Sequence, residues 1–224
     1  MRSYLNKVLA IVGKDVASEL RTREVLSSMF VFALLVIVIF NFAFELKVDN
    51  IEAVAPGVLW VAIVFAGMLG LNRSFITEKD RGCIEGLLLC PVERSAIYLG
   101  KMVGNLLFMT AMEAILLPIY AAFFNLPVFT PKLLLIVVLG TVGFAAVGTL
   151  FSAVAVHTRT REVMLPILLL PVAVPVLVAA VKATGDAMAS TAPSVPGPWL
   201  GVLIAFDVIF LTAAFLTFEY IFQE

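Results

Sequence analysis

Residues 25–44 read VLSSMFVFALLVIVIFNFAF, an apolar run without a single charged side chain. A helix needs about 20 such residues to cross the hydrocarbon core of a bilayer. Five more stretches meet this requirement, at residues 54–71, 102–124, 133–156, 163–181 and 199–218. Transmembrane β-strands would be shorter and would alternate in hydrophobicity, so helices are the structure that satisfies the backbone here. The sequence therefore predicts an all-α integral membrane protein, a bundle of six transmembrane helices over residues 25–218.

The composition agrees with this class. Hydrophobic residues make up 62% of the chain and charged residues 14%, with a mean hydropathy of +1.10. A soluble domain is about 45–50% apolar and about 25% charged. Too little polar sequence is left to cover a soluble core of this hydrophobicity. A soluble enzyme or soluble binding module is therefore excluded.

The distribution of Lys and Arg predicts the orientation of the bundle, because cytoplasmic segments of membrane proteins are enriched in these residues. With the N-terminus inside, the cytoplasmic segments hold twelve of them: Arg2, Lys7, Lys14, Arg21, Arg23, Arg73, Lys79, Arg81, Arg94, Lys101, Arg159 and Arg161. The opposite side holds three: Lys47, Lys132 and Lys182. Both termini are therefore predicted to be cytoplasmic, with residues 219–224 as a short tail.

Residues 1–24 form a separate predicted element, an amphipathic helix. Three cations recur at seven-residue spacing and share one face: Lys7, Lys14 and Arg21. Apolar residues lie near the opposite face: Leu5, Val8, Val12, Val16 and Leu20. Glu19 interrupts this apolar stripe. The pattern favours a helix lying in the cytoplasmic membrane interface, and a basic leader that only sets the topology is the alternative.

Two of the spans carry marked local composition. The fourth is rich in small residues that allow close helix approach: Gly140, Thr141, Gly143, Ala145, Ala146 and Gly148. Packing within the chain is the favoured use of these residues, and a dimer seam is the alternative.

The fifth span carries Pro166, Pro171 and Pro175, each of which removes a helix donor. We expect this helix to be bent and to contact other parts of the protein.

Motifs for catalysis are absent from the sequence. The single histidine, His157, falls in a predicted cytoplasmic turn and has no second imidazole to share a metal or haem. No GxSxG, HExxH or nucleophile–base pair is present. A phosphate-binding GxxxxGK[ST] loop is also missing. We therefore predict no catalytic residue, metal site or cofactor on this chain, and expect any ATP to bind another chain.

Two acidic residues stand at membrane depth, Glu113 in the third span and Asp207 in the sixth. A carboxylate at the centre of a bilayer costs about 2.5–3.5 kcal/mol on insertion scales. Each is therefore expected to face the bundle or to be held protonated. A functional role and a hydrogen-bonded structural role are both open for each acid, and the claim of Asp207 to a functional role is weaker.

Residues 72–101 form the longest predicted cytoplasmic loop, within which Gly82 and Pro91 bound a short helix. Ile84, Leu87 and Leu88 fall on one face of that helix, at i, i+3 and i+4. A two-turn helix has no core of its own to cover this face, so it needs a partner surface or the bilayer. The predicted contact residues of this coupling loop are Gly82, Ile84, Glu85, Leu87, Leu88 and Pro91.

Three motifs resemble one known family. They are VAPGVLWVA at residues 54–62, GCIEGLLLCP at residues 82–91 and MLPILLLPVAVP at residues 164–175. In this order they are similar to the haem exporter protein B (CcmB) family, the permease subunit of the cytochrome c maturation ABC complex. The likeness covers nearly the whole chain. Asn72 and Arg81 depart from it, because the family usually has acidic residues there.

The resemblance implies a permease of the ABC-2 exporter type in the bacterial inner membrane. It also implies an ATP-binding cassette subunit, a haem-handling membrane protein and a periplasmic haem chaperone as partners. ATP hydrolysis on the partner would then be linked to release of the haem-loaded chaperone, with haem handled by the partners and the Gly82–Pro91 loop as the coupling element. A homodimer is a further open arrangement. An ABC-2 exporter of a drug, lipid or polysaccharide and an intramembrane enzyme using Glu113 and Asp207 are the alternatives.

Overall fold

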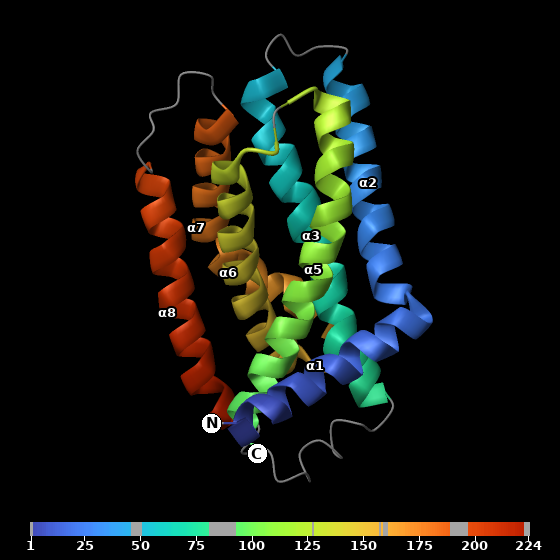
Figure 1. The fold of residues 1–224 in the computed structure, drawn as a ribbon, viewed down its shortest axis with the longest axis vertical. Helices are drawn as coiled ribbons and strands as arrows, with labels where there is room; N and C mark the ends of the chain where they lie inside the picture. The colour runs from blue at the N-terminus through green and yellow to red at the C-terminus, as the bar shows by residue number, and fades with distance from the viewer. Residues whose placement is uncertain are drawn as a thin grey trace.

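The structure, a computed structural model, describes residues 2–45, 51–80, 93–126, 128–156, 158, 161–188 and 197–221. Seven helices fill these residues: α1 (Arg2–Thr22), α2 (Glu24–Glu45), α3 (Ile51–Asp80), α5 (Arg94–Phe124), α6 (Pro131–Ala155), α7 (Arg161–Met188) and α8 (Pro198–Ile221). No strand occurs in the described part of the chain. Helices α2 to α8 form an elongated bundle, and α1 lies across one end of it (Figure 1).

Six of the helices are long and apolar enough to cross a membrane, as the sequence predicted. The prediction of an all-α membrane bundle is confirmed. The two helices that flank the predicted 72–101 loop both extend into it: α3 continues to Asp80, and α5 already begins at Arg94. Both ends of the predicted 72–101 loop are therefore helical, and residues 81–92 lie outside the described part.

Helices α3 and α6 form the centre of the bundle. In their membrane-spanning windows 72% and 67% of residues are buried, against 22% in each of α2 and α8. The Trp60 indole of α3 lies against Gly140 of α6, where an added Cβ would stand 2.1 Å from the ring. The same indole donates a hydrogen bond of 3.0 Å to the Thr184 hydroxyl of α7. A glycine is therefore required at position 140 to bring α3, α6 and α7 together.

The small residues of α6 are used for packing inside the chain. A Cβ at Gly148 would meet the Leu71 side chain of α3 at 2.3 Å, and one at Gly143 would meet Asp207 of α8 at 2.3 Å. These glycines thus receive side chains from two of the helices around α6, in agreement with the favoured interpretation of the small-residue pattern.

The three prolines of the fifth span lie inside helix α7. One stripe of α7 is buried in the bundle: Leu165, Leu169, Ala173, Val176, Ala180 and Ala183. Pro171 and Pro175 lie off this stripe and are exposed. Helix α7 packs against α3, α6 and α8, so the expected contact with the rest of the protein is present.

Helix α1 presents three sides rather than the two that the sequence predicted. Val8, Ile11 and Val12 are buried against the bundle. Exposed leucines occupy a second side: Leu5, Leu9 and Leu20. Lys14 and Arg21 are exposed on a third side. The predicted apolar stripe is therefore divided, because Val8 and Val12 serve the protein core while Leu5 and Leu20 face outward.

Candidate functional site

The buried charges of the bundle define the candidate site, and the first of them joins α1 to α5. Lys101 of α5 is 2% exposed, and its Nζ lies 2.9 Å from Oδ2 of Asp15 on α1. The same ammonium donates to the Ser74 carbonyl of α3 at 3.4 Å. The two helices approach closely here because a glycine, Gly100, faces the Ile11 side chain. The buried Lys101 ammonium therefore links α5 to α1 by an ion pair and to α3 by a hydrogen bond.

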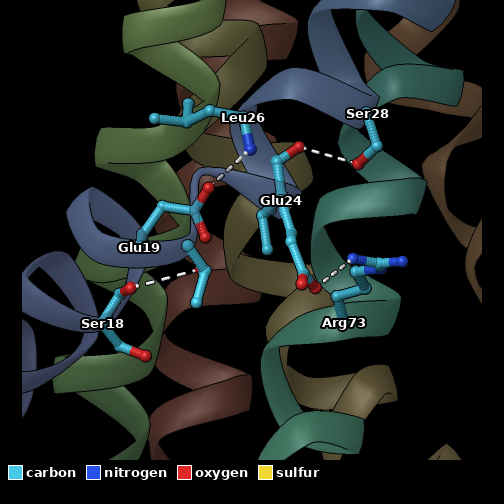
Figure 2. Close-up of polar contacts among 8 residues, drawn as sticks. Ser18, Glu19, Glu24, Leu26, Ser28 and Arg73 are labelled. Carbon is cyan, nitrogen blue, oxygen red and sulfur yellow. Dashed lines mark hydrogen bonds and ion pairs between the residues drawn. The ribbon is translucent and has the colours of Figure 1, made fainter.

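A second buried acid shapes the corner between α1 and α2 (Figure 2). Glu19 is 5% exposed, and its Oε1 accepts a hydrogen bond of 2.8 Å from the Leu26 backbone N–H. That N–H belongs to the first turn of α2, where helix donors lack partners and negative charge is favourable. The corner itself is Arg23, in the left-handed region at φ 55°. Glu19 therefore caps the helix that follows its own.

An exposed ion pair lies beside this corner. Glu24, the first residue of α2, pairs with Arg73 of α3 at 2.9 Å, as Figure 2 shows. The Arg73 side chain is 49% exposed and the Glu24 side chain 68%. Water weakens such pairs, so this contact contributes little compared with the buried carboxylate of Glu19.

Glu113, predicted as an intramembrane acid, has a partner in the next helix. Its side chain on α5 is 3% exposed. The Thr141 hydroxyl of α6 donates a hydrogen bond of 2.6 Å to Glu113 Oε1. This contact belongs to a seam between α5 and α6, in which Asn105 also donates to the Thr149 hydroxyl at 3.0 Å. Glu113 is thus one member of a hydrogen-bonded helix interface.

Asp207, the second predicted acid, has different surroundings. It is 5% exposed on α8, and neither of its carboxylate oxygens has a hydrogen-bond partner in the described residues. Its Oδ1 faces Gly143 of α6, where an added Cβ would be 2.3 Å away. An apolar setting makes an unpartnered buried acid costly to keep. Among the buried Asp, Glu and Lys side chains that are described, Asp207 alone lacks a partner.

The two acids contact α6 at nearly the same depth, but they do not meet. Thr141 and Gly143 are two residues apart, which on a helix of 3.6 residues per turn is a rotation of about 200°. Glu113 and Asp207 therefore approach different sides of α6, and the helix separates them. A shared carboxylate pair, as a glycosidase or protease would need, is not formed.

The residues of the coupling loop fall outside the described residues: Gly82, Ile84, Glu85, Leu87, Leu88 and Pro91. His157 falls outside them as well. Sequence analysis missed the roles of Asp15, Glu19 and Lys101. The sequence signal that could have identified Asp15 and Glu19 is their four-residue spacing, which places both on one side of α1. Lys101 was assigned to a loop because it precedes an apolar run. Among the residues that are described, no group of His, Cys, Asp and Glu is arranged to hold a metal ion.

Comparison with known proteins gives one consistent result. The family model described as CcmB protein matches residues 6–220. Heme exporter protein B of Haemophilus influenzae is 30% identical over 172 residues, covering 76% of this chain and 77% of that protein. Heme exporter protein B of Pseudomonas aeruginosa is 29% identical over 154 residues, covering 68% of this chain and 69% of that protein. With six helices able to span a membrane, this multi-pass membrane protein belongs to the CcmB family.

Proposed function

We propose that this chain is the permease subunit of an ABC transporter complex for cytochrome c biogenesis. The observation that supports this function most directly is the family match over residues 6–220, which includes all six membrane-spanning helices. The sequence has no phosphate-binding loop. ATP hydrolysis is therefore assigned to a separate ATP-binding cassette chain, and this subunit is non-catalytic. An exporter of a drug, lipid or polysaccharide is not favoured by the family match.

The fold suggests how a signal from the ATPase would spread. The coupling loop joins the end of α3 at Asp80 to the start of α5 at Arg94. Lys101, two turns into α5, is paired with Asp15 of α1 and bonded to the Ser74 carbonyl of α3. Displacement of the coupling loop by the ATPase would therefore move α3, α5 and α1 together. Glu19 passes that movement to α2 through the Leu26 N–H.

We further propose that the ATPase releases a haem-loaded periplasmic chaperone and that a haem-handling membrane protein is the other partner. Imidazole ligands for haem are limited to one on this chain, because His157 is its single histidine and is predicted to be cytoplasmic. The chain purified without partners is expected to show no stoichiometric Soret absorbance. A haem spectrum that disappears in His157→Ala would contradict this assignment.

The coupling loop gives the experiment that tests the function. The double variant Glu85→Lys/Leu87→Asp reverses the charge at Glu85, the predicted charged contact. It also places a carboxylate at Leu87, on the predicted apolar face of the loop helix. We expect normal membrane insertion and abundance, with loss of the co-purifying ATPase or of cytochrome c maturation. Glu93→Lys is the matched control, because Glu93 is exposed at the start of α5 and makes no side-chain cap hydrogen bond. Wild-type ATPase association and maturation in the double variant would rule out the loop as the coupling element.

The inner-membrane orientation has its own test. Thr130 directly precedes α6, and Met188 is the last residue of α7. These two helix ends lie at the end of the bundle opposite α1, so both residues are on one side of the membrane (Figure 1). The positive-inside rule assigns this side to the periplasm. Reporter fusions at Thr130 and Met188 should report the periplasm, and one at His157 the cytoplasm. A periplasmic signal at His157 would overturn the orientation.

A further inference from the structure

A cavity of about 300 Å³ lies between α6, α7 and α8 at the end of the bundle opposite α1. Its walls are mostly apolar and include Leu135, Ile136, Trp199 and Leu200. Two charged residues also line it, Lys132 and Asp186. Leu135 is 48% exposed, so the cavity opens on the outer surface of the bundle, where lipid surrounds a membrane protein. A cavity with apolar walls and one charge of each sign calls for an amphipathic ligand.

Both charges sit at the unfavourable ends of their own helices. Lys132 is the second residue of α6, where the helix dipole presents positive charge. Asp186 lies in the last turn of α7, where the dipole presents negative charge. Neither residue has an ion pair or a side-chain hydrogen bond to another described residue. A ligand with a negative group at Lys132 and a positive group at Asp186 would relieve both conflicts.

The helix ends around the cavity strengthen this polarity. The N-termini of α6 and α8, at Pro131 and Pro198, both lie at this end of the bundle, as does the C-terminus of α7. Helix N-termini attract phosphate groups. Tryptophan, here the half-buried Trp199, is typical of the headgroup level of a bilayer. The cavity thus combines an anion side, a cation side and an apolar channel at the depth where lipid headgroups lie.

We propose that this cavity binds a zwitterionic phospholipid whose headgroup carries a primary amine, of the phosphatidylethanolamine type. The phosphate contacts Lys132 and the amino ends of α6 and α8. The ammonium contacts Asp186 at the carboxyl end of α7. The first part of an acyl chain lies along Leu135, Ile136 and Leu200, and the rest continues into the bilayer. The site requires only that the chain spans a membrane, so it is independent of the cargo and of the partner chains.

Trp199 provides a direct readout, since it lines the cavity while Trp60 is buried at 2% exposure. The full chain is reconstituted in phosphatidylcholine vesicles containing phosphatidylethanolamine, with bromine on the acyl chains of one lipid or the other. The Trp199→Phe variant supplies the baseline from Trp60. Brominated phosphatidylethanolamine is expected to quench Trp199 at a mole fraction about fivefold lower than brominated phosphatidylcholine.

Charge variants test which groups are recognised. Lys132→Gln and Asp186→Asn should each abolish the preference for phosphatidylethanolamine. Lys182→Gln, an exposed lysine on α7 outside the lining, is the matched control and should keep it. Equal quenching by the two lipids in the wild-type chain would overturn the proposal. So would a preference for brominated phosphatidylglycerol that survives Asp186→Asn, or loss of the preference when inorganic phosphate is added, because either result would describe a plain anion site.

Discussion

Buried charges have partners at the end of the bundle that carries α1, whereas the buried charge at the contact between α6 and α8 has none among the described residues. At the α1 end, Asp15 is paired with Lys101 and Glu19 accepts the Leu26 N–H. At the α6–α8 contact, Asp207 is equally enclosed, yet its carboxylate has no partner among the described residues and faces Gly143. Charges of the first kind fasten helices together. The second kind is costly to keep in the fold, and a functional role for it is a hypothesis that variants can test.

Glu113 stands between these two cases. It lies as deep in the bundle as Asp207, but the Thr141 hydroxyl donates to it at 2.6 Å. Its hydrogen bond fits the structural interpretation, and its ionisable group keeps the functional one open. Stability and activity measured on the same variants separate the three situations.

The largest effect is expected from Lys101→Met, which keeps the volume of the side chain and leaves Asp15 paired with the exposed Lys14, at 3.4 Å, instead of the buried ammonium of Lys101. Removing one member of a buried pair is strongly destabilising, and a loss of about 3 kcal/mol in unfolding free energy is expected. Denaturation of the purified protein in mixed detergent measures it. Asp15→Asn/Lys101→Met should recover most of the loss, and Lys182→Met should cause none. Equal losses in the single and double variants would show that the pair does not fasten α1.

Asp207→Ala should shift stability the other way. Removing an unpartnered buried acid relieves its desolvation, so a gain of about 1 to 2 kcal/mol is expected. Cytochrome c maturation should fall in the same variant if the acid is kept for function. Gly143→Ala provides the geometric control, because its Cβ would lie 2.3 Å from Asp207 Oδ1. It should destabilise the wild-type chain more than the Asp207→Ala chain, in which the Phe206 ring at 3.1 Å is the remaining close neighbour. A loss of stability in Asp207→Ala would mean that the acid has a structural partner.

Glu113→Gln is expected to change the unfolding free energy by less than about 1 kcal/mol, because the amide oxygen still accepts from Thr141. Its effect should appear in cytochrome c maturation, since the glutamine cannot ionise. Glu113→Leu, which removes the acceptor, should lower stability by comparison. Normal maturation in Glu113→Gln would leave Glu113 a structural acid.

The smallest effect is expected at the α1–α2 corner. Glu19→Gln keeps an acceptor for the Leu26 N–H and removes the negative charge from the start of α2, at a loss of about 0.5 kcal/mol. Glu19→Ala also removes the cap, and about 1 kcal/mol should be lost. Arg73→Gln is the control, because it breaks the exposed pair with Glu24, which should contribute almost nothing, and leaves the charges at the start of α2 unchanged. An effect of Arg73→Gln as large as that of Glu19→Ala would contradict the assignment of the cap.

The sequence alone predicted the spans because a bilayer imposes one length on every crossing helix. It also identified Glu113 and Asp207, since an ionisable residue stands out in an apolar run. It could not predict that Glu113 meets Thr141 while Asp207 meets Gly143, because that depends on the rotation of α5 and α8 against α6. Lys101 was missed for a related reason. Its neighbours marked the edge of an apolar run, and its partner Asp15 lies on a helix outside the membrane-spanning set.

The two carboxylates of α1 can meet their partners at different stages of synthesis. Glu19 finds the Leu26 N–H within the next turns of chain, so the corner can form as soon as α2 enters the membrane. Asp15 has to wait for Lys101, which is made only after α2 and α3. Until then α1 can lie on the membrane surface without its final contact. The Asp15–Lys101 pair can therefore form only after the first three membrane-spanning helices have been made and have packed together.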